Sequence, residues 1–219
     1  MFRKIMIAVL LFGAAGAAVG AGTFASFSAS TTNQTSTFAT GSLTLSNKVN
    51  AGTACLSSAG GIDTNANTGC DAILASATGL KPGSTPSTAQ LTLTNTGTLT
   101  PSALQYAMSA CTPGDSAGVS VHGSGNPCTT IEVYIQEYTS SAFTTKTGAC
   151  IFPAAASNCA TDFSAASDTL SAVPTSATTI SGGLATSRYF EISAQLPSSA
   201  GNEFQGRKAD FAFTWNIVQ

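Results

Sequence analysis

The chain has 219 residues, and only 8% of them are charged, against roughly a quarter in an ordinary soluble domain. Hydrophobic residues make up 43%, which is enough for a sizeable core in a single domain. The formal net charge is −2, which argues against nucleic acid as a partner because phosphate binding needs clustered Lys and Arg.

The first 25 residues have the pattern of a secretory signal peptide. A short positive region precedes an apolar stretch over Ile5–Phe12. Small residues at Thr23 and Ala25 predict cleavage between Ala25 and Ser26. A retained membrane anchor is the alternative, but the apolar stretch is shorter than the ~20 residues that a spanning helix needs. We therefore expect a secreted protein that has no membrane segment after a signal peptidase has cut it.

The residues after this cleavage site form an uncharged, proline-free arm over Ser26–Thr37. Phe27 is its only large apolar side chain, and Ser26 and Ser28 flank it. An arm of this kind folds back as an edge strand or is added as a strand to another subunit. Addition joins a donor surface to a different acceptor surface and builds an open filament. We expect Ser26, Phe27 and Ser28 to make the polymerising contact; an unstructured N-terminus is the alternative.

Residues 38–219 show the period-two alternation of β-strands and no long helical periodicity. The first strand is predicted over Phe38–Leu45. Further alternating segments are Leu91–Thr94, Ile131–Gln136, Arg188–Leu196 and Ala209–Val218. One apolar and one polar face per strand is typical of an antiparallel sandwich. We expect one all-β domain, a jelly-roll-like β-sandwich whose long loops are tied by disulfides.

Six cysteines follow the signal peptide, and an even number in an exported chain indicates disulfides. They fall into three local couples, which predict the pairs Cys55–Cys70, Cys111–Cys128 and Cys150–Cys159. Zinc is the alternative, but it favours close couples such as C-x-x-C, which the chain lacks. The segments around these cysteines, including Pro113–Pro127 and Thr139–Thr179, are predicted to be surface loops.

Residues suited to catalysis are scarce, and no catalytic site, cofactor or metal is predicted. His122 is the only histidine, and Asp115 and Ser120 lie near it in the sequence. A Ser-His-Asp set depends on three-dimensional geometry, and serine neighbours are common in this chain. Glu132 and Glu137 are five residues apart, so a strand places them on opposite faces, and we expect solvated side chains.

A polar loop contains four oxygen-bearing side chains that are candidates for calcium binding. They are Asp63, Asn65, Asn67 and Asp71. Their spacing does not fit a known calcium loop, since the glycine and the bidentate glutamate of an EF-hand are misplaced. We therefore interpret them as an ordinary polar loop.

Three groups of motifs occur in order along the chain. Residues 22–28 and Thr37–Leu45 match a G-T-x-A-x-F cleavage junction followed by a T-F-x-x-G-x-L-x-L strand. The other two groups are Gly79–Ser84 leading to Leu91–Gly97, and Leu196–Gly206 leading to the final strand. Together they resemble the TasA and camelysin (CalY) family at the start, middle and end of the chain.

This resemblance implies a jelly-roll sandwich that is exported by the Sec route and cut by a dedicated signal peptidase. It also implies self-assembly into extracellular fibres of a biofilm matrix, in which the N-terminal strand of one subunit completes the sheet of its neighbour. Some members are labelled camelysin-type metalloendopeptidases, so a secreted endopeptidase is one alternative, which a single histidine supports poorly. A surface binding module that does not polymerise is the other.

Overall fold

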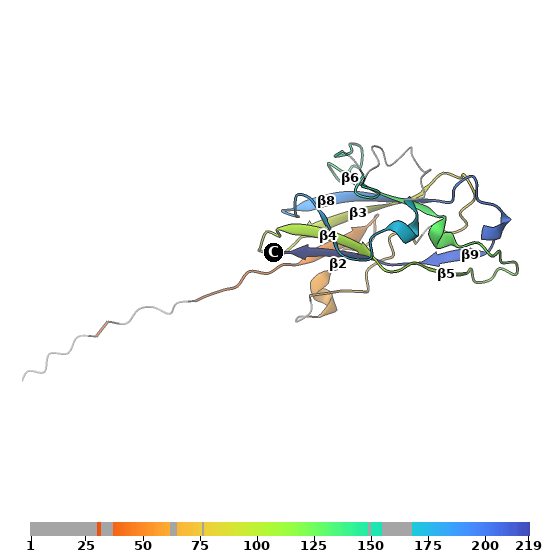
Figure 1. The fold of residues 1–219 in the computed structure, drawn as a ribbon. Coiled ribbons are helices and arrows are strands. Elements are labelled where there is room, and N and C mark those ends of the chain that lie inside the picture. The colour runs from red at the N-terminus through yellow and green to blue at the C-terminus, as the bar shows by residue number, and fades with distance from the viewer. Residues whose placement is uncertain (1–29, 32–36, 62–64, 76, 149, 155–167) are drawn as a thin grey trace, which may run out of the picture. The chain divides into compact units, whose positions relative to one another are not determined.

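The structure is a computed structural model, and it describes residues 30–31, 37–61, 65–75, 77–148, 150–154 and 168–219 (Figure 1). The chain divides into two units, residues 1–39 and residues 40–219, and the second contains all the strands described below. Several predicted features lie outside the described residues, namely the signal peptide, its cleavage site at Ala25 and Ser26, Phe27, Ser28, Asp63 and Cys159. No helix in the described part has the length and apolar character needed to span a bilayer.

The second unit is all-β, and every strand pair in it is antiparallel. The larger sheet has five strands in the order β2 (Cys55–Leu56), β1 (Leu45–Val49), β3 (Ser87–Asn95), β8 (Ser187–Gln195) and β6 (Glu132–Tyr138). The smaller sheet has the order β10 (Phe213–Val218), β4 (Ala103–Met108) and β7 (Thr178–Ile180). Short 3₁₀ helices occupy Ser57–Gly60, Pro127–Thr129, Leu170–Ala172 and Asn202–Phe204. The predicted all-β antiparallel class is confirmed.

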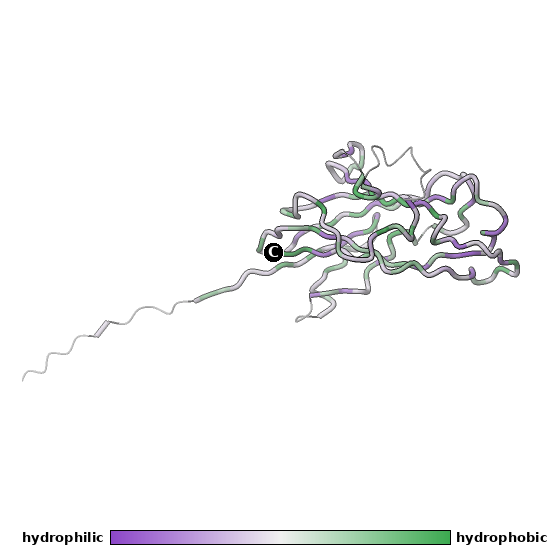
Figure 2. The backbone as a smooth tube through the Cα atoms, viewed as in Figure 1, coloured by the Kyte–Doolittle hydropathy of each residue, from purple (hydrophilic) through white to green (hydrophobic). Residues whose placement is uncertain are grey.

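The core lies between these sheets and follows from the alternation in the sequence. In β3, Leu91 and Leu93 are fully buried, and in β8 the same holds for Phe190 and Ile192. Leu104 of β4 belongs to the same hydrophobic cluster. Figure 2 shows hydrophobic stretches along the strands and more hydrophilic residues in the loops. Burial of one such side chain contributes about 1.5–3 kcal/mol to the free energy of folding. The buried side chains of these strands therefore stabilise the packing of the two sheets.

The first strand starts later than the sequence predicts, at Leu45 instead of Phe38. Ser42 N–H donates to the side-chain hydroxyl of Thr98 at 2.9 Å, so a side chain replaces the backbone partner that a strand ladder requires. Gly97 lies so close that a Cβ there would be 2.3 Å from the Ser42 carbonyl oxygen. The Phe38 side chain is 96% exposed.

The predicted last strand is interrupted. Its first part belongs to β9 (Arg207–Asp210), which pairs with β5 (Thr112–Asp115), and β10 follows after two residues. Phe213 pairs with Met108 and Asp210 with Thr112, so the register shifts by one residue, as at a β-bulge. Pro113 therefore lies in a strand and not in the predicted loop, which β5 tolerates as an edge strand.

Part of the segment Thr139–Thr179 is not the surface loop that was predicted. Phe152, Leu170 and Val173 are buried members of the core cluster. Backbone hydrogen bonds connect Ile135 of β6 to Ile151 and Phe152. The strand β6 is consequently buried on both faces. Its polar residues are therefore buried as well as its apolar ones, although the two alternate in the sequence.

The structure contains the predicted disulfides Cys55–Cys70 and Cys111–Cys128. Cys150 is disulfide-bonded as well, and its predicted partner Cys159 lies outside the described residues. These two disulfides close loops of 15 and 17 residues, and each contributes about 3 kcal/mol to stability in the chain-entropy model.

Candidate functional site

The smaller sheet ends at β10 in the described part of the chain. Among the described residues, β10 pairs only with β4. In an antiparallel strand, alternate residues direct their backbone groups to opposite edges. About half of the N–H and C=O groups of β10 therefore point to an edge at which the described residues place no strand.

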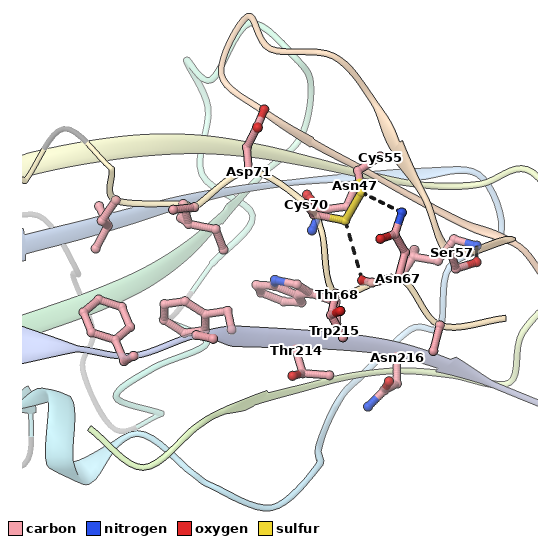
Figure 3. A pocket seen from close by; sticks show the side chains of 18 of the residues that line it. Asn47, Cys55, Ser57, Asn67, Thr68, Cys70, Asp71, Thr214, Trp215 and Asn216 are labelled. Atoms are coloured by element: carbon pink, nitrogen blue, oxygen red, sulfur yellow. Dashed lines mark hydrogen bonds between the residues drawn. A yellow bond between two sulfur atoms is a disulfide. The ribbon is translucent and has the colours of Figure 1, made fainter. Parts of the chain in front are cut away.

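A groove of about 650 Å³, lined by apolar and polar side chains, lies beside β10 (Figure 3). Its walls are β1, the segment 65–75 and residues 209–217. The predicted apolar face of the last strand lines it, namely Phe211, Phe213, Trp215 and Ile217. Trp215 is 7% exposed and stacks on Phe190 at 5.3 Å between ring centroids, whereas the other three are only partly buried. The sandwich thus leaves part of its hydrophobic face uncovered here.

The groove continues toward β9 as a second hollow of about 810 Å³. Leu74, Ala209 and Phe211 line both spaces. Asp71 and Asp210 are the only charged residues among those that line the groove beside β10.

Two buried polar atoms in the groove have no hydrogen-bond partner among the described residues. They are Asn47 Oδ1 of β1 and Trp215 Nε1 of β10. A buried polar group without a partner costs about 1–3 kcal/mol. Such groups are rare in native proteins, and each one calls for an explanation.

The segment Cys70–Ala75 covers part of the groove. Ile73 is 9% exposed and belongs to the core cluster, and Leu74 packs against it. The Cys55–Cys70 disulfide ties the start of the segment to β2. Among the described residues, its only backbone hydrogen bond runs from Ala77 N–H to the Leu74 carbonyl at 2.9 Å. The segment is therefore held by side chains and a disulfide, without strand pairing.

The asparagines that were weighed as calcium ligands have structural partners. Asn65 Nδ2 donates to the Leu43 carbonyl at 2.6 Å, and Asn65 Oδ1 accepts from the Ser57 hydroxyl at 2.7 Å. Asn67 Nδ2 donates to the Leu56 carbonyl at 3.0 Å. These amides shape the loop under the disulfide. In the described part of the chain, no group of three or more His, Cys, Asp and Glu side chains is arranged to hold a metal ion.

His122 lies close to Asp115 but not in a catalytic arrangement with Ser120. Its Nδ1 is 2.9 Å from the Gly206 carbonyl oxygen and 3.8 Å from Asp115 Oδ1. Asp115 is also ion-paired with Arg207 across the β5–β9 ribbon. Ser120 is exposed, and no hydrogen bond in the described part of the chain links it to His122. The contacts of His122 thus fasten its loop to β9.

The prediction that Glu132 and Glu137 are solvated is wrong. Glu137 accepts two hydrogen bonds from the guanidinium of Arg188, at 2.5 and 2.7 Å, and both side chains are mostly buried. Glu132 is 6% exposed on the other face of β6, near Asp168, to which the Tyr134 hydroxyl donates. The later segment that pairs with β6 at Thr169 buries Glu132, and the ion pair with Arg188 occupies Glu137. No sequence pattern indicated either contact.

No family model matches this chain, and no curated protein matches it at a significant level.

Proposed function

We propose that this protein is an exported structural subunit that assembles into extracellular fibres. In this proposal the N-terminal arm Ser26–Thr37 of one copy adds a strand to β10 of the next. The observation that carries the proposal is the edge of β10, on which the described residues place no strand, beside an open groove with the aromatic residues Phe211 and Phe213 in its wall. Added strands satisfy such an edge with main-chain hydrogen bonds and place alternate side chains in pockets.

The arm fits this acceptor in length and in chemistry. Ser26–Thr37 has twelve residues, the same number as the stretch 207–218 that contains β9 and β10. The arm carries no charge, and Asp71 and Asp210 are the charged residues among those that line the groove beside β10. Phe27 would add its ring to the aromatic cluster around Phe213. The resemblance to the TasA and camelysin family supports the same mode of assembly.

Arm and groove are different surfaces of one molecule, so each added copy presents a new acceptor. A contact of this heterologous kind propagates as an open filament unless the rotation closes a ring. Export by a signal peptide precedes assembly in this scheme, and the disulfides agree with an oxidising location outside the cell.

Electron microscopy of the concentrated mature protein, starting at Ser26, tests the proposal. We expect fibres from this chain. We expect soluble, folded and non-fibrous protein from Phe27→Asp, because insertion would bury a charge without a partner. A chain that begins at Phe38 should behave in the same way, since it has no donor arm.

Folding of both variants is checked by circular dichroism, because the core and the disulfides lie in the second unit. Fibres of parental appearance from either variant would show that the arm is not the polymerising element. Absence of fibres from the mature protein under all conditions would refute the proposed function.

A further inference from the structure

Four buried side-chain atoms in the described residues have no hydrogen-bond partner, and they fall into two groups. Glu132 Oε2 and Gln136 Oε1 belong to β6. Asn47 Oδ1 and Trp215 Nε1 belong to residues that line the groove beside β10, and both atoms are shielded from solvent (Figure 3). The second group consists of one acceptor and one donor, from the two strands that border the same space.

Asn47 occupies a position that the fold assigns to an apolar residue. Leu45 and Val49 of β1 point into the core, and Asn47 lies between them on the same face. Nevertheless it carries an amide whose oxygen is buried and unpaired. A leucine or valine would pack here without this penalty, so the amide calls for a reason other than stability of the isolated subunit.

Trp215 cannot turn its N–H to solvent. Its ring stacks on Phe190 at 5.3 Å and contacts Tyr106 at 6.0 Å between ring centroids. It is also close to Phe213, at 6.3 Å. These neighbours hold the indole in the groove with its donor buried and unpaired. A ligand that enters the groove can supply the missing acceptor.

We propose that Asn47 and Trp215 bind the main chain of the arm of a second copy when it enters the groove. Asn47 Oδ1 accepts from a backbone N–H of the arm, and Trp215 Nε1–H donates to a backbone carbonyl. This inference rests on the proposed function, and it adds the residues that recognise the arm.

We expect the main chain of the arm to be recognised, because all of its buried N–H and C=O groups need hydrogen-bond partners. Every strand has two rows of N–H and C=O groups, and a strand added to β10 pairs one row with it. The second row needs partners as well, because buried backbone groups without hydrogen bonds are costly. On the facing side, β1 is already paired with β2 and with β3. Side chains such as Asn47 must then take the place of a strand edge.

The test is Asn47→Leu, which removes the amide and keeps a side chain in the groove. For the unassembled protein we expect an unchanged or higher melting temperature, since an unpaired polar group is removed. For assembly we expect a critical concentration about tenfold higher, because one buried hydrogen bond to the arm is lost. If Asn47 had a structural role alone, Asn47→Leu would lower the melting temperature and leave the critical concentration unchanged.

Gln136→Leu is the control for assembly; it should lower the melting temperature, because Gln136 Nε2 donates to the Glu137 and Gly148 carbonyl oxygens. It also replaces an amide whose oxygen is buried and unpaired, but on β6, outside the residues that line the groove. Its critical concentration should equal that of the parent. If leucine at position 47 prevents folding, Asn47→Ala provides the same comparison without filling the groove.

Trp215 provides a second readout, because it is the only tryptophan of the chain. Titration of the mature protein with a synthetic peptide of residues 26–37 should change its fluorescence saturably. Asn47→Leu should weaken the apparent affinity about tenfold. Equal affinity and equal critical concentration for Asn47→Leu and the parent would overturn the inference and leave the proposed function intact. A parent that neither binds the peptide nor forms fibres would overturn both.

Discussion

At the scale of single residues, Glu132 shows how tertiary burial changes the chemistry of a side chain. Its pKa is raised above the ordinary value of 4.5, first by burial and then by the nearby charge of Asp168. Between 4.5 and the raised native pKa, the folded protein holds a proton that the unfolded chain has released. Stability therefore falls as the pH rises through this interval.

Glu132→Gln tests this account, since a neutral amide does not titrate. We expect the variant to be more stable than the parent at neutral pH. Its stability should also fall less than that of the parent as the pH rises above 4.5. Urea unfolding between pH 4 and pH 8 measures both effects. Glu137→Gln is the control, and it should destabilise because it weakens the paired hydrogen bonds to Arg188. A parental pH profile for Glu132→Gln would contradict the account.

At the scale of elements, the segment Cys70–Ala75 covers the groove in which we place the arm. It makes no backbone hydrogen bond to β1 or β10 in the described residues, and it is anchored mainly by Ile73. An arm entering the groove must displace this segment at least in part. The free energy involved is that of one buried isoleucine, about 1.5–3 kcal/mol.

Ile73→Ser should therefore shorten the lag before fibres form while the protein stays folded. Light scattering over time at fixed protein concentration measures the lag, and circular dichroism monitors folding. Leu56→Ser is the control, because Leu56 lies next to the same disulfide but is exposed. A folded Ile73→Ser protein with a parental lag would show that the segment does not limit access.

At the scale of the whole molecule, separate donor and acceptor surfaces make chain termination testable. A chain that begins at Phe38 keeps the groove and lacks the arm. It should accept one arm at a growing end and offer none to the next copy.

Small amounts of this truncated chain, mixed with the mature protein, should shorten the fibres seen by electron microscopy. The truncated chain with Asn47→Leu should shorten them less at the same concentration. Fibre lengths that do not respond to the truncated chain would contradict the head-to-tail arrangement.

Much of the fold was predictable because its signals are local. The alternation in β3, β8 and β10 indicated which side chains face the core. The cysteines of the pairs Cys55–Cys70 and Cys111–Cys128 are close in sequence, so pairing each cysteine with its neighbour predicted both disulfides. The polymerising role of Ser26, Phe27 and Ser28 stays a prediction.

The remaining features depend on contacts between distant parts of the chain. Pro113 lies in a strand because Ala209 pairs with it, and Glu132 is buried because a later segment covers β6. The candidate site depends on such contacts as well. The sequence alone determined that Trp215 lies on an apolar face, since a period of two is a property of neighbouring residues. Only the tertiary structure decided that β10 ends its sheet and that Asn47 points toward the same groove, because strand order and register are set by long-range pairing.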